Sequence, residues 1–406
     1  MQIKNFKTLY QFEGYRIDRV DLGDRQARIV LGCDARYGLR CHGCGGKPAL
    51  NRLSRSEAID LPLGPLKKVV IDFPVIQIKC SGCGEWNSVR PPGIDPSARA
   101  TVRLMRAVSW ACRYLPLDEV EQLYAVSAST ARRYDKTILL RELPQPNLDG
   151  LVTLLVDEKA VRKRHGYVTL VMNGETGELL HMSEGKKKDS LKQFFDRLNP
   201  EQKATIEAVA MDRSGAYHAC VKENLPDAVI VFDKFHVVAS YNAALDELRR
   251  IEWRQAQDEH KKVIKGSRFL LFGNTENLDS TERHRLRELL TLNEPLATAH
   301  ILKDALKQLW TYIYPKAASN YLHRWCCQAR DSGIAQLKKF ARSLMKAHDE
   351  IVAFCHYPIT TAKLESFNAL VARVVRKSCG VSDLEYLFLK LRQEALGESI
   401  RSANLA

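Results

Sequence analysis

The sequence predicts a multidomain α+β protein, and three observations lead to this class. The chain has 406 residues, which is longer than a single hydrophobic core usually extends. Its hydrophobic pattern changes along the chain, from short strands with paired cysteines to a helical segment, then to buried strands and a long helical stretch. Hydrophobic residues make up 45% of the chain, which indicates folded domains rather than disorder.

The charge balance indicates a polyanionic partner. The chain carries 62 Lys and Arg against 48 Asp and Glu, a formal charge of +14, so nucleic acid is the first candidate. No apolar run approaches the length of a membrane span, and the polar N-terminus lacks a secretory pattern. We therefore expect a bacterial cytoplasmic or a nuclear location, where the 11 cysteines are thiols or metal ligands rather than disulfides.

Residues 1–95 are expected to form strands around a zinc ribbon. Apolar and polar residues alternate between Tyr10 and Leu31, which is typical of short strands. Two Cys-x-x-Cys pairs follow, at Cys41 and Cys44 and at Cys80 and Cys83. Four thiolates fill the coordination of one structural Zn²⁺. A redox dithiol is the alternative, which the repetition of the motif disfavours; His42 and Cys33 are spare ligand candidates, better explained as a loop residue and a core thiol.

Residues 98–146 are expected to form a helix-turn-helix domain after a linker, Arg90–Ser97. Helical periodicity predicts helices over Val102–Tyr114, Leu117–Tyr124 and Ala128–Leu140, the last one capped by Ser127. In this layout the third helix enters a major groove, although an ordinary three-helix bundle has the same pattern. The expected DNA contacts are Ser127, Ser129, Thr130, Arg132, Arg133 and Lys136.

Residues 150–236 are expected to form an α/β core. Its predicted elements are the strands Leu151–Val156, Tyr167–Asn173, Leu179–Glu184, Ile206–Met211 and Ala228–Phe232, and the helices Asp189–Leu198 and Gly215–Asn224. This is the element order of a ribonuclease-H-like fold, in which the first and fourth strands are neighbours. Asp157 and Asp212 end those two strands, and carboxylates at such ends suit hard metal ions.

A helical insertion is expected to interrupt this core over residues 237–354. The core then resumes over 355–406 with a helix, Thr360–Val375, that carries Glu365, and with a last helix, Leu384–Leu396. Asp157, Asp212 and Glu365 together would hold two Mg²⁺ or Mn²⁺ ions for phosphodiester chemistry. Arg376 lies about 20° from Glu365 around the helix axis, so the same face presents a guanidinium for phosphate.

Other polar residues are expected to support this site. Asp233, the main rival to Asp212, is assigned to a supporting or DNA-contacting position beside the metal ligands. His236 either contacts the scissile phosphate or a water, or packs in the core. Arg162, Lys163, Arg164 and the run Lys186–Lys188 form a solvated face, or bind the DNA backbone if they flank a phosphate-cutting site. Trp253 and Trp310 offer rings for a flipped base, but buried packing is preferred for both.

The motif order resembles bacterial insertion-sequence transposases of the ISL3 family over essentially the whole chain. The matching stretches are LLVDEKAVRKRHGY, AVAMDRSGAY, VFDKFHVV and KLESFNALVARVVRKSCG. The resemblance implies a DDE triad of Asp157, Asp212 and Glu365, a DKFH-type element at Asp233–His236, and a basic stretch at Arg373, Arg376 and Lys377. One departure is Ser366-Phe367, where the family pattern suggests Gly after the glutamate.

The resemblance also implies the partners. They are double-stranded DNA, as terminal inverted repeats and target, and a second copy of the chain on that DNA, in the nucleoid of a bacterial cytoplasm. Two alternatives remain at this stage. One is a non-catalytic DNA-binding regulator derived from a transposase, against which three convergent carboxylates argue. The other is a structure-specific nuclease on the same core, which would cut DNA without joining its 3′ ends to a target.

Overall fold

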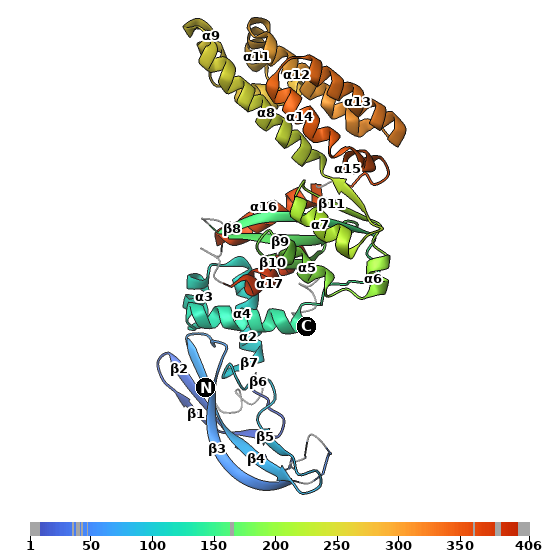
Figure 1. Ribbon diagram of the computed structural model, residues 1–406. Coiled ribbons are helices and arrows are strands. Elements are labelled where there is room, and N and C mark those ends of the chain that lie inside the picture. Colours follow the sequence, from blue (N-terminus) through green and yellow to red (C-terminus); the bar gives the residue numbers. More distant parts are fainter. Residues whose placement is uncertain are drawn as a thin grey trace. The chain divides into compact units, whose positions relative to one another are not determined.

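The computed structural model describes residues 9–34, 36–37, 41, 44–46, 48–162, 166–359, 362–377 and 383–396, without the side chains of Pro48, Arg162 and residues 362–365. The chain divides into two compact units (Figure 1). The first comprises Met1–Gln145, Lys377–Cys379 and Glu385–Ala406, and the second comprises Pro146–Arg376 and Gly380–Leu384. Within the described ranges, no helix is long and apolar enough to cross a membrane.

A seven-stranded sheet forms the N-terminal part of the first unit. Its strands are β1 (Tyr15–Leu22), β2 (Gln26–Cys33), β3 (Pro48–Asp60), β4 (Lys68–Cys80), β5 (Trp86–Val89), β6 (Ile94–Asp95) and β7 (Ala100–Thr101). The order is β1-β2-β4-β3-β7-β6, and β5 pairs with β4. The strands expected between Tyr10 and Leu31 are confirmed as β1 and β2, and β3 pairs with β4 along its whole length. Ile29, Leu31 and Ile71 are buried in its core.

The segment Arg90–Ser97 is more ordered than the linker that its composition predicts. It contains β6, which pairs with β7, and the buried side chain of Asp95. One Asp95 carboxylate oxygen accepts hydrogen bonds from the backbone N–H groups of Ser97 and Ala98, and the other accepts from Arg141 at 2.6 Å. Proline and glycine predicted a chain break here, but the aspartate anchors the segment to the following helices.

Three helices follow the sheet within the first unit: α2 (Val102–Tyr114), α3 (Leu117–Tyr124) and α4 (Ala128–Glu142). Their positions confirm the predicted trihelical pattern. Ala125 adopts a left-handed conformation with φ of 53° and turns the chain between α3 and α4. The Ser127 side chain accepts a hydrogen bond from the Thr130 N–H at 3.2 Å and so caps α4, as expected.

The C-terminal helix α17 (Leu384–Ala395) packs on these helices. From Glu385 onward it belongs to the first unit. The contact is built around Asp135 of α4, which is fully buried. Asp135 accepts hydrogen bonds from Ser109 Oγ at 2.7 Å, Tyr386 OH at 2.6 Å and Lys390 Nζ at 3.0 Å. The expected grouping of 355–406 with the α/β core is therefore wrong for α17, since helical periodicity predicts a buried face but not its partner.

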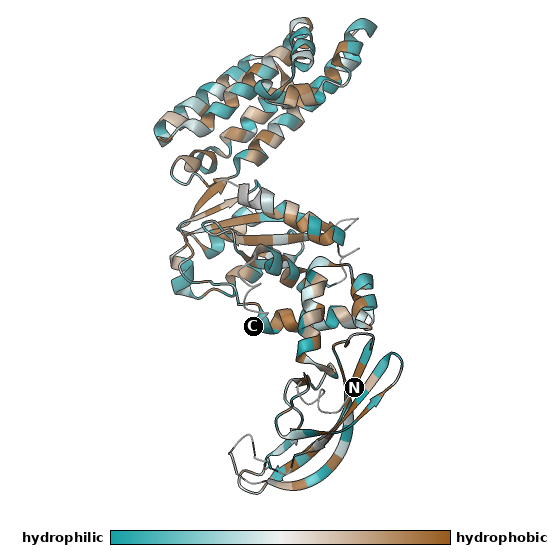
Figure 2. Ribbon diagram, turned by 180° about the vertical axis from the view of Figure 1, so that it is seen from behind, coloured by the Kyte–Doolittle hydropathy of each residue, from teal (hydrophilic) through white to brown (hydrophobic). Residues whose placement is uncertain are grey.

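A five-stranded sheet organises the second unit. Its strands are β8 (Thr153–Arg162), β9 (Gly166–Asn173), β10 (Leu179–Glu184), β11 (Ala208–Met211) and β12 (Val229–Phe232), with helices α5 (Lys188–Phe195), α6 (Pro200–Ala204) and α7 (Gly215–Asn224). The order is β10-β9-β8-β11-β12, antiparallel at β10-β9-β8 and parallel at β8-β11-β12. The expected pairing of the first and fourth strands is confirmed. Figure 2 shows these strands as predominantly hydrophobic, as buried strands should be.

The segment after β12 is helical, as predicted. It comprises α8 (Lys234–Gln255), α9 (Asp258–Ile264), α10 (Arg268–Phe272), η1 (Thr275–Asn277), α11 (Ser280–Leu292), α12 (Glu294–Lys307), η2 (Gln308–Thr311), α13 (Pro315–Asp331), α14 (Ala335–Met345), α15 (His348–Val352) and η3 (Ala353–Cys355), and α16 (Ala362–Lys377) follows. Tyr241, Trp325 and Phe340 meet edge to face with ring centroids 5.1–5.9 Å apart. Trp310 packs against this core as expected, whereas Trp253 is 40% exposed and contradicts the prediction of burial.

Two buried histidines of the second unit predict a fall in stability at mildly acidic pH. Burial and the charge of Arg197 lower the pKa of His181 to about 4, and burial and Lys303 lower the pKa of His300 to about 4. The unfolded state therefore binds protons that the folded state does not, so stability should fall as pH drops from about 6.5 towards 4. Each histidine accounts for about 3 kcal/mol of this loss.

Thermal unfolding of the full chain between pH 7 and pH 5 measures this dependence. The variant His300→Leu should show a shallower slope than the native chain. The variant His323→Leu is the control, because His323 is exposed on α13. Equal slopes in the native chain and His300→Leu would contradict the assignment.

Candidate functional site

Asp157 lies within β8 rather than at its end, which corrects the sequence prediction. β8 continues to Arg162 because β9 pairs with it over that length. The parallel partner β11 pairs only as far as Ala210 opposite Leu155, and the chain leaves the sheet after Met211. Extending the register by two residues places Asp212 next to Asp157. Asp157 therefore lies where the parallel pairing of β8 with β11 stops, although β8 itself continues.

The two aspartates differ in exposure and share an electrostatic environment. Asp157 is 6% exposed, and its Oδ1 accepts a hydrogen bond from the Glu158 N–H at 2.8 Å. Asp212 is half-buried and accepts from the Ser214 N–H at 3.1 Å. Burial raises the pKa of Asp212, and the negative charge of Asp157 raises it further, against the opposing effects of His236 and the Ser214 N–H. Two carboxylates that repel each other in this way favour a cation between them.

Asp233 and His236 lie beside these carboxylates. The Asp233 N–H donates to the carbonyl oxygen of Met211, and its buried side chain caps α8 by accepting from the Phe235 N–H. His236 Nε2 lies 3.8 Å from Asp233 Oδ2 and 4.0 Å from Asp157 Oδ1. The His236 side chain is 47% exposed, so it is not a packed core histidine, and an imidazole in this position can also meet an incoming phosphate.

Helix α16 reaches the same edge of the sheet through Asn368. Its Nδ2 donates a hydrogen bond to Asp157 Oδ2 at 2.9 Å. The side chain of Glu365 lies outside the described residues, but its backbone belongs to α16, three residues before Asn368. Sequence reasoning missed Asn368, and the available signal was its position one turn after the glutamate in KLESFNAL.

Two further residues missed by sequence reasoning tie this edge to the helical segment. Arg213, which follows Asp212, donates from Nη2 to the carbonyl oxygen of Ser343 near the end of α14 at 2.7 Å. His218 Nε2 lies 2.9 Å from Glu350 Oε1 on α15. The helical segment therefore supports the loop that carries Asp212, because a guanidinium at a helix C-terminus meets unpaired carbonyls there.

The basic residues that were expected to contact DNA differ in their surroundings. Lys163 and Arg164 lie outside the described residues, and Arg162 is described only as backbone in β8. Arg373 and Arg376 are exposed on α16. Lys377 instead donates from Nζ to the carbonyl oxygen of Arg113 within the first unit, so its ammonium is engaged internally. Lys186 Nζ stands 4.0 Å from the centre of the Tyr167 ring and 3.6 Å from Glu158.

The candidate DNA-reading residues of α4 fall into two groups. The Arg132 guanidinium stacks over the Tyr386 ring at 5.1 Å, and Lys136 pairs with Glu385 at 2.7 Å. α17 therefore covers that side of the helix, which the sequence did not indicate. Ser127, Ser129 and Arg133 are exposed, and Ser127 and Thr130 are joined by the capping hydrogen bonds.

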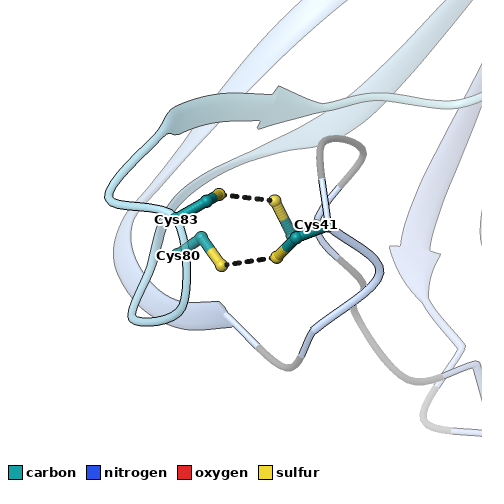
Figure 3. A group of neighbouring side chains, drawn as sticks. Cys41, Cys80 and Cys83 are labelled. Atoms are coloured by element: carbon teal, nitrogen blue, oxygen red, sulfur yellow. Dashed lines mark hydrogen bonds between the residues drawn. The ribbon is translucent and has the colours of Figure 1, made fainter.

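The four cysteines of the predicted ribbon come together at one end of the first unit's sheet. Their sulfurs all lie within 4.8 Å of one another. Cys41 faces Cys83 (Figure 3), and their sulfurs are 3.6 Å apart; the sulfurs of Cys44 and Cys80 are 3.4 Å apart. Asn87 Nδ2 approaches Cys41 Sγ at 3.7 Å. This cluster could hold one metal ion with four thiolate ligands.

The two cysteine turns have the same backbone hydrogen bonds. The Cys41 N–H donates to Gly46 O and the Gly45 N–H donates to Cys41 O, while Cys80 pairs in the same way with Glu85 and Gly84. Gly45 and Gly84 have φ of +70° and +73°, which explains the glycine after each second cysteine. Hydrogen bonds from the backbone N–H of Cys83 and from the Cys44 thiol lower the pKa of Cys80 to about 6, which favours the thiolate. Cys33 is exposed and outside this cluster, and His42 lies outside the described residues.

Comparison with known proteins identifies the family. A family model described as a transposase of the ISL3 type matches residues 154–391. The chain is 32% identical over 396 residues to the transposase of insertion sequence element IS1001 from Bordetella parapertussis, covering 96% of this chain and 97% of that protein. It is also 26% identical over 278 residues to the transposase of element IS1557 from Mycobacterium tuberculosis, covering 63% of this chain and 60% of that protein. The chain therefore belongs to the ISL3 family of insertion-sequence transposases.

Proposed function

We propose that the second unit is a ribonuclease-H-like catalytic core in which Asp157, Asp212 and Glu365 bind two Mg²⁺ or Mn²⁺ ions and cut and join DNA. The observation that carries this proposal is the meeting of three elements at one edge of the sheet. β8 and β11 bring Asp157 and Asp212 together, and α16, which carries Glu365, is bonded to Asp157 through Asn368. The strand order and the mixed pairing agree with this fold.

The residues of this edge fit divalent cations of the hard, oxygen-binding type. The donors are carboxylates, the aspartates repel each other, and the neighbouring N–H groups leave further oxygen lone pairs open. Bound divalent ions supply activation of the attacking oxygen and stabilisation of the leaving oxygen at a phosphodiester. The chain itself orients the carboxylates, keeps Asp157 away from solvent and presents His236 and the exposed Arg373 and Arg376 to the DNA backbone.

The first unit is proposed to recognise the terminal inverted repeats. Its three helices have the helix-turn-helix layout, with α4 as the reading helix. Ser129 and Arg133 are the leading contacts because they are exposed, whereas α17 engages Arg132 and Lys136. The four-cysteine cluster is proposed to bind one structural Zn²⁺, because four thiolates leave no open position for water.

Action on both ends of an element requires two sites. We therefore propose that two copies assemble on DNA, and that the protein works at the nucleoid in a bacterial cytoplasm. The alternatives, a non-catalytic regulator and a structure-specific nuclease, share the DNA-binding unit or the core. They differ in whether DNA is cut and whether its 3′ ends are then joined to a target.

The proposal predicts metal-dependent cleavage that depends on Asp212. The native chain should cut DNA that carries the element's ends in Mg²⁺. The variant Asp212→Asn should lower the cleavage rate by about 10³-fold or more, because a lost metal ligand removes several kcal/mol of transition-state stabilisation. Gel-based cleavage assays measure the rate, and filter binding measures the affinity for DNA.

The matched control is Asp227→Asn, which changes an exposed aspartate between α7 and β12. It should leave the cleavage rate unchanged. Specific DNA binding without cutting by the native chain would favour the regulator. Cutting without joining of 3′ ends to target DNA would favour the nuclease, and cutting that survives in Asp212→Asn would remove this aspartate from the site.

A further inference from the structure

The carboxamide of Asn368 has a defined orientation at the proposed catalytic edge. Its Nδ2 donates to Asp157 Oδ2 at 2.9 Å. An ionised carboxylate only accepts hydrogen bonds, so the nitrogen of the amide must face Asp157 and the oxygen must point elsewhere. The sides of α16 next to Asn368 are fixed by packing, since Phe367 and Val371 are 5% and 1% exposed.

The other end of this side chain has no partner among the described residues. Asn368 Oδ1 is buried and accepts no hydrogen bond from the residues that the structure describes. A buried carbonyl oxygen without a donor costs about 1–3 kcal/mol, so native proteins seldom leave one unpaired. If Asn368 served only for packing, an apolar side chain at its position would make the fold more stable, because it would remove the unpaired oxygen. Among the residues that the structure describes none supplies a donor, so the oxygen is open to one that a bound group brings.

Asp157 depends on Asn368 for its orientation. Its Oδ1 is held by the Glu158 N–H at 2.8 Å and its Oδ2 by Asn368, so within the described part of the chain each oxygen accepts one hydrogen bond and can accept another. Asn368 and Glu365 are three residues apart, about 60° around the helix axis, which places them on neighbouring parts of one helical face. One turn of α16 thus carries both a proposed metal ligand and the group that orients another.

We infer that Asn368 is a positioning residue of the metal site, an inference that rests on the proposed function. Its Nδ2 fixes the rotation of the Asp157 carboxylate, and its Oδ1 accepts a hydrogen bond from a water in the coordination shell of the divalent ion. A water that is bound to a cation is a strong donor, and it would satisfy the oxygen for which the described residues offer no donor. Partners that orient metal ligands typically contribute 10–100-fold to metal affinity.

The test is the affinity of the full chain for Mn²⁺ without DNA, measured by the electron paramagnetic resonance signal of free Mn²⁺. The variant Asn368→Ala should raise the dissociation constant about 10–100-fold. The variant Asn224→Ala is the matched control, because Asn224 also donates from Nδ2 at 2.9 Å within the second unit, but to the backbone carbonyl of Cys220. Its dissociation constant should equal that of the native chain.

Two further variants separate the possible outcomes. Asn368→Leu fills the space and removes the unpaired oxygen, so a purely structural role predicts a stable protein with native Mn²⁺ affinity, whereas the inference predicts the same loss as in Asn368→Ala. Asp157→Asn should abolish the site. Native affinity in folded Asn368→Leu, with loss in Asp157→Asn, would overturn the role of Asn368 alone. Native affinity in Asp157→Asn would overturn the proposed catalytic site itself.

Discussion

Replacing Cys80 by serine is expected to release the zinc ion and to unfold the end of the sheet formed by β3, β4 and β5. The four sulfurs lie within 4.8 Å of one another, while that end of the sheet exposes Leu50, Leu53 and Trp86, and its buried Ile78 lies outside the main hydrophobic cluster of the sheet. Binding of structural zinc by four thiolates is worth about 10 kcal/mol or more, and this energy belongs to folding.

Metal analysis and hydrogen exchange measure this effect on the full chain. The native protein should hold one zinc per chain, and Cys80→Ser should hold none and exchange rapidly in β3–β5. The variant Cys33→Ser is the control, because Cys33 is an exposed thiol of the same sheet outside the cluster. A zinc-free native chain with slow exchange in β3–β5 would contradict the structural role of the metal.

Replacing Lys390 by methionine is expected to destabilise the first unit by about 3–5 kcal/mol, because it leaves the charge of Asp135 buried without its cation. The Asp135 side chain is 0% exposed and that of Lys390 is 9% exposed, so water screens this pair very little. Lys390 also donates to Cys112 O and to Gln393 Oε1, and these bonds would be lost as well. In α2 and α4, opening for hydrogen exchange should become at least about 100-fold more frequent.

A second ion pair between α4 and α17 provides the control. Lys136 and Glu385 form an ion pair between α4 and α17 whose glutamate is 61% exposed, so Glu385→Gln should change stability by about 1 kcal/mol or less. The double variant Asp135→Asn with Lys390→Met should recover part of the loss, because no charge remains buried. Equal losses of stability in Lys390→Met and Glu385→Gln would show that the buried ion pair stabilises the first unit no more than the exposed one.

Elements set by local signals were predictable from the sequence. The three helices α2–α4 lie where helical periodicity and the Ser127 cap put them, and α4 differs only by two residues at its end. The adjacency of Asp157 and Asp212 was also predictable. The order of strands and helices along the chain predicted a fold in which the first and fourth strands are neighbours, and these strands are β8 and β11. The cysteine cluster followed from spacing, because a glycine turn brings two sulfurs to one point.

Features that depend on tertiary pairing were not predictable. β3 carries arginines and exposed leucines without a clear alternation, and it is a strand because β4 pairs with it from Pro48 to Asp60. The apolar run stops at Asp157, which predicted the end of the strand there. In the structure β8 pairs with β9 as far as Arg162. The position of Asn368 one turn after Glu365 was its only signal in the sequence, and this signal is weak because asparagines on helices usually face solvent; its bond to Asp157 sets it apart.

The position of α17 also sets the order in which the protein can be completed during translation. Asp135 leaves the ribosome 255 residues before Lys390, which is a delay of about 10–50 s at ordinary rates of protein synthesis. During that interval the proposed DNA-reading helix lacks the cation and the tyrosine that its buried carboxylate needs. A chain that stops within the catalytic segment would therefore present an unfinished α4. We therefore expect fragments that end before α17 to bind the element's ends less tightly than the full chain, because they lack Tyr386 and Lys390.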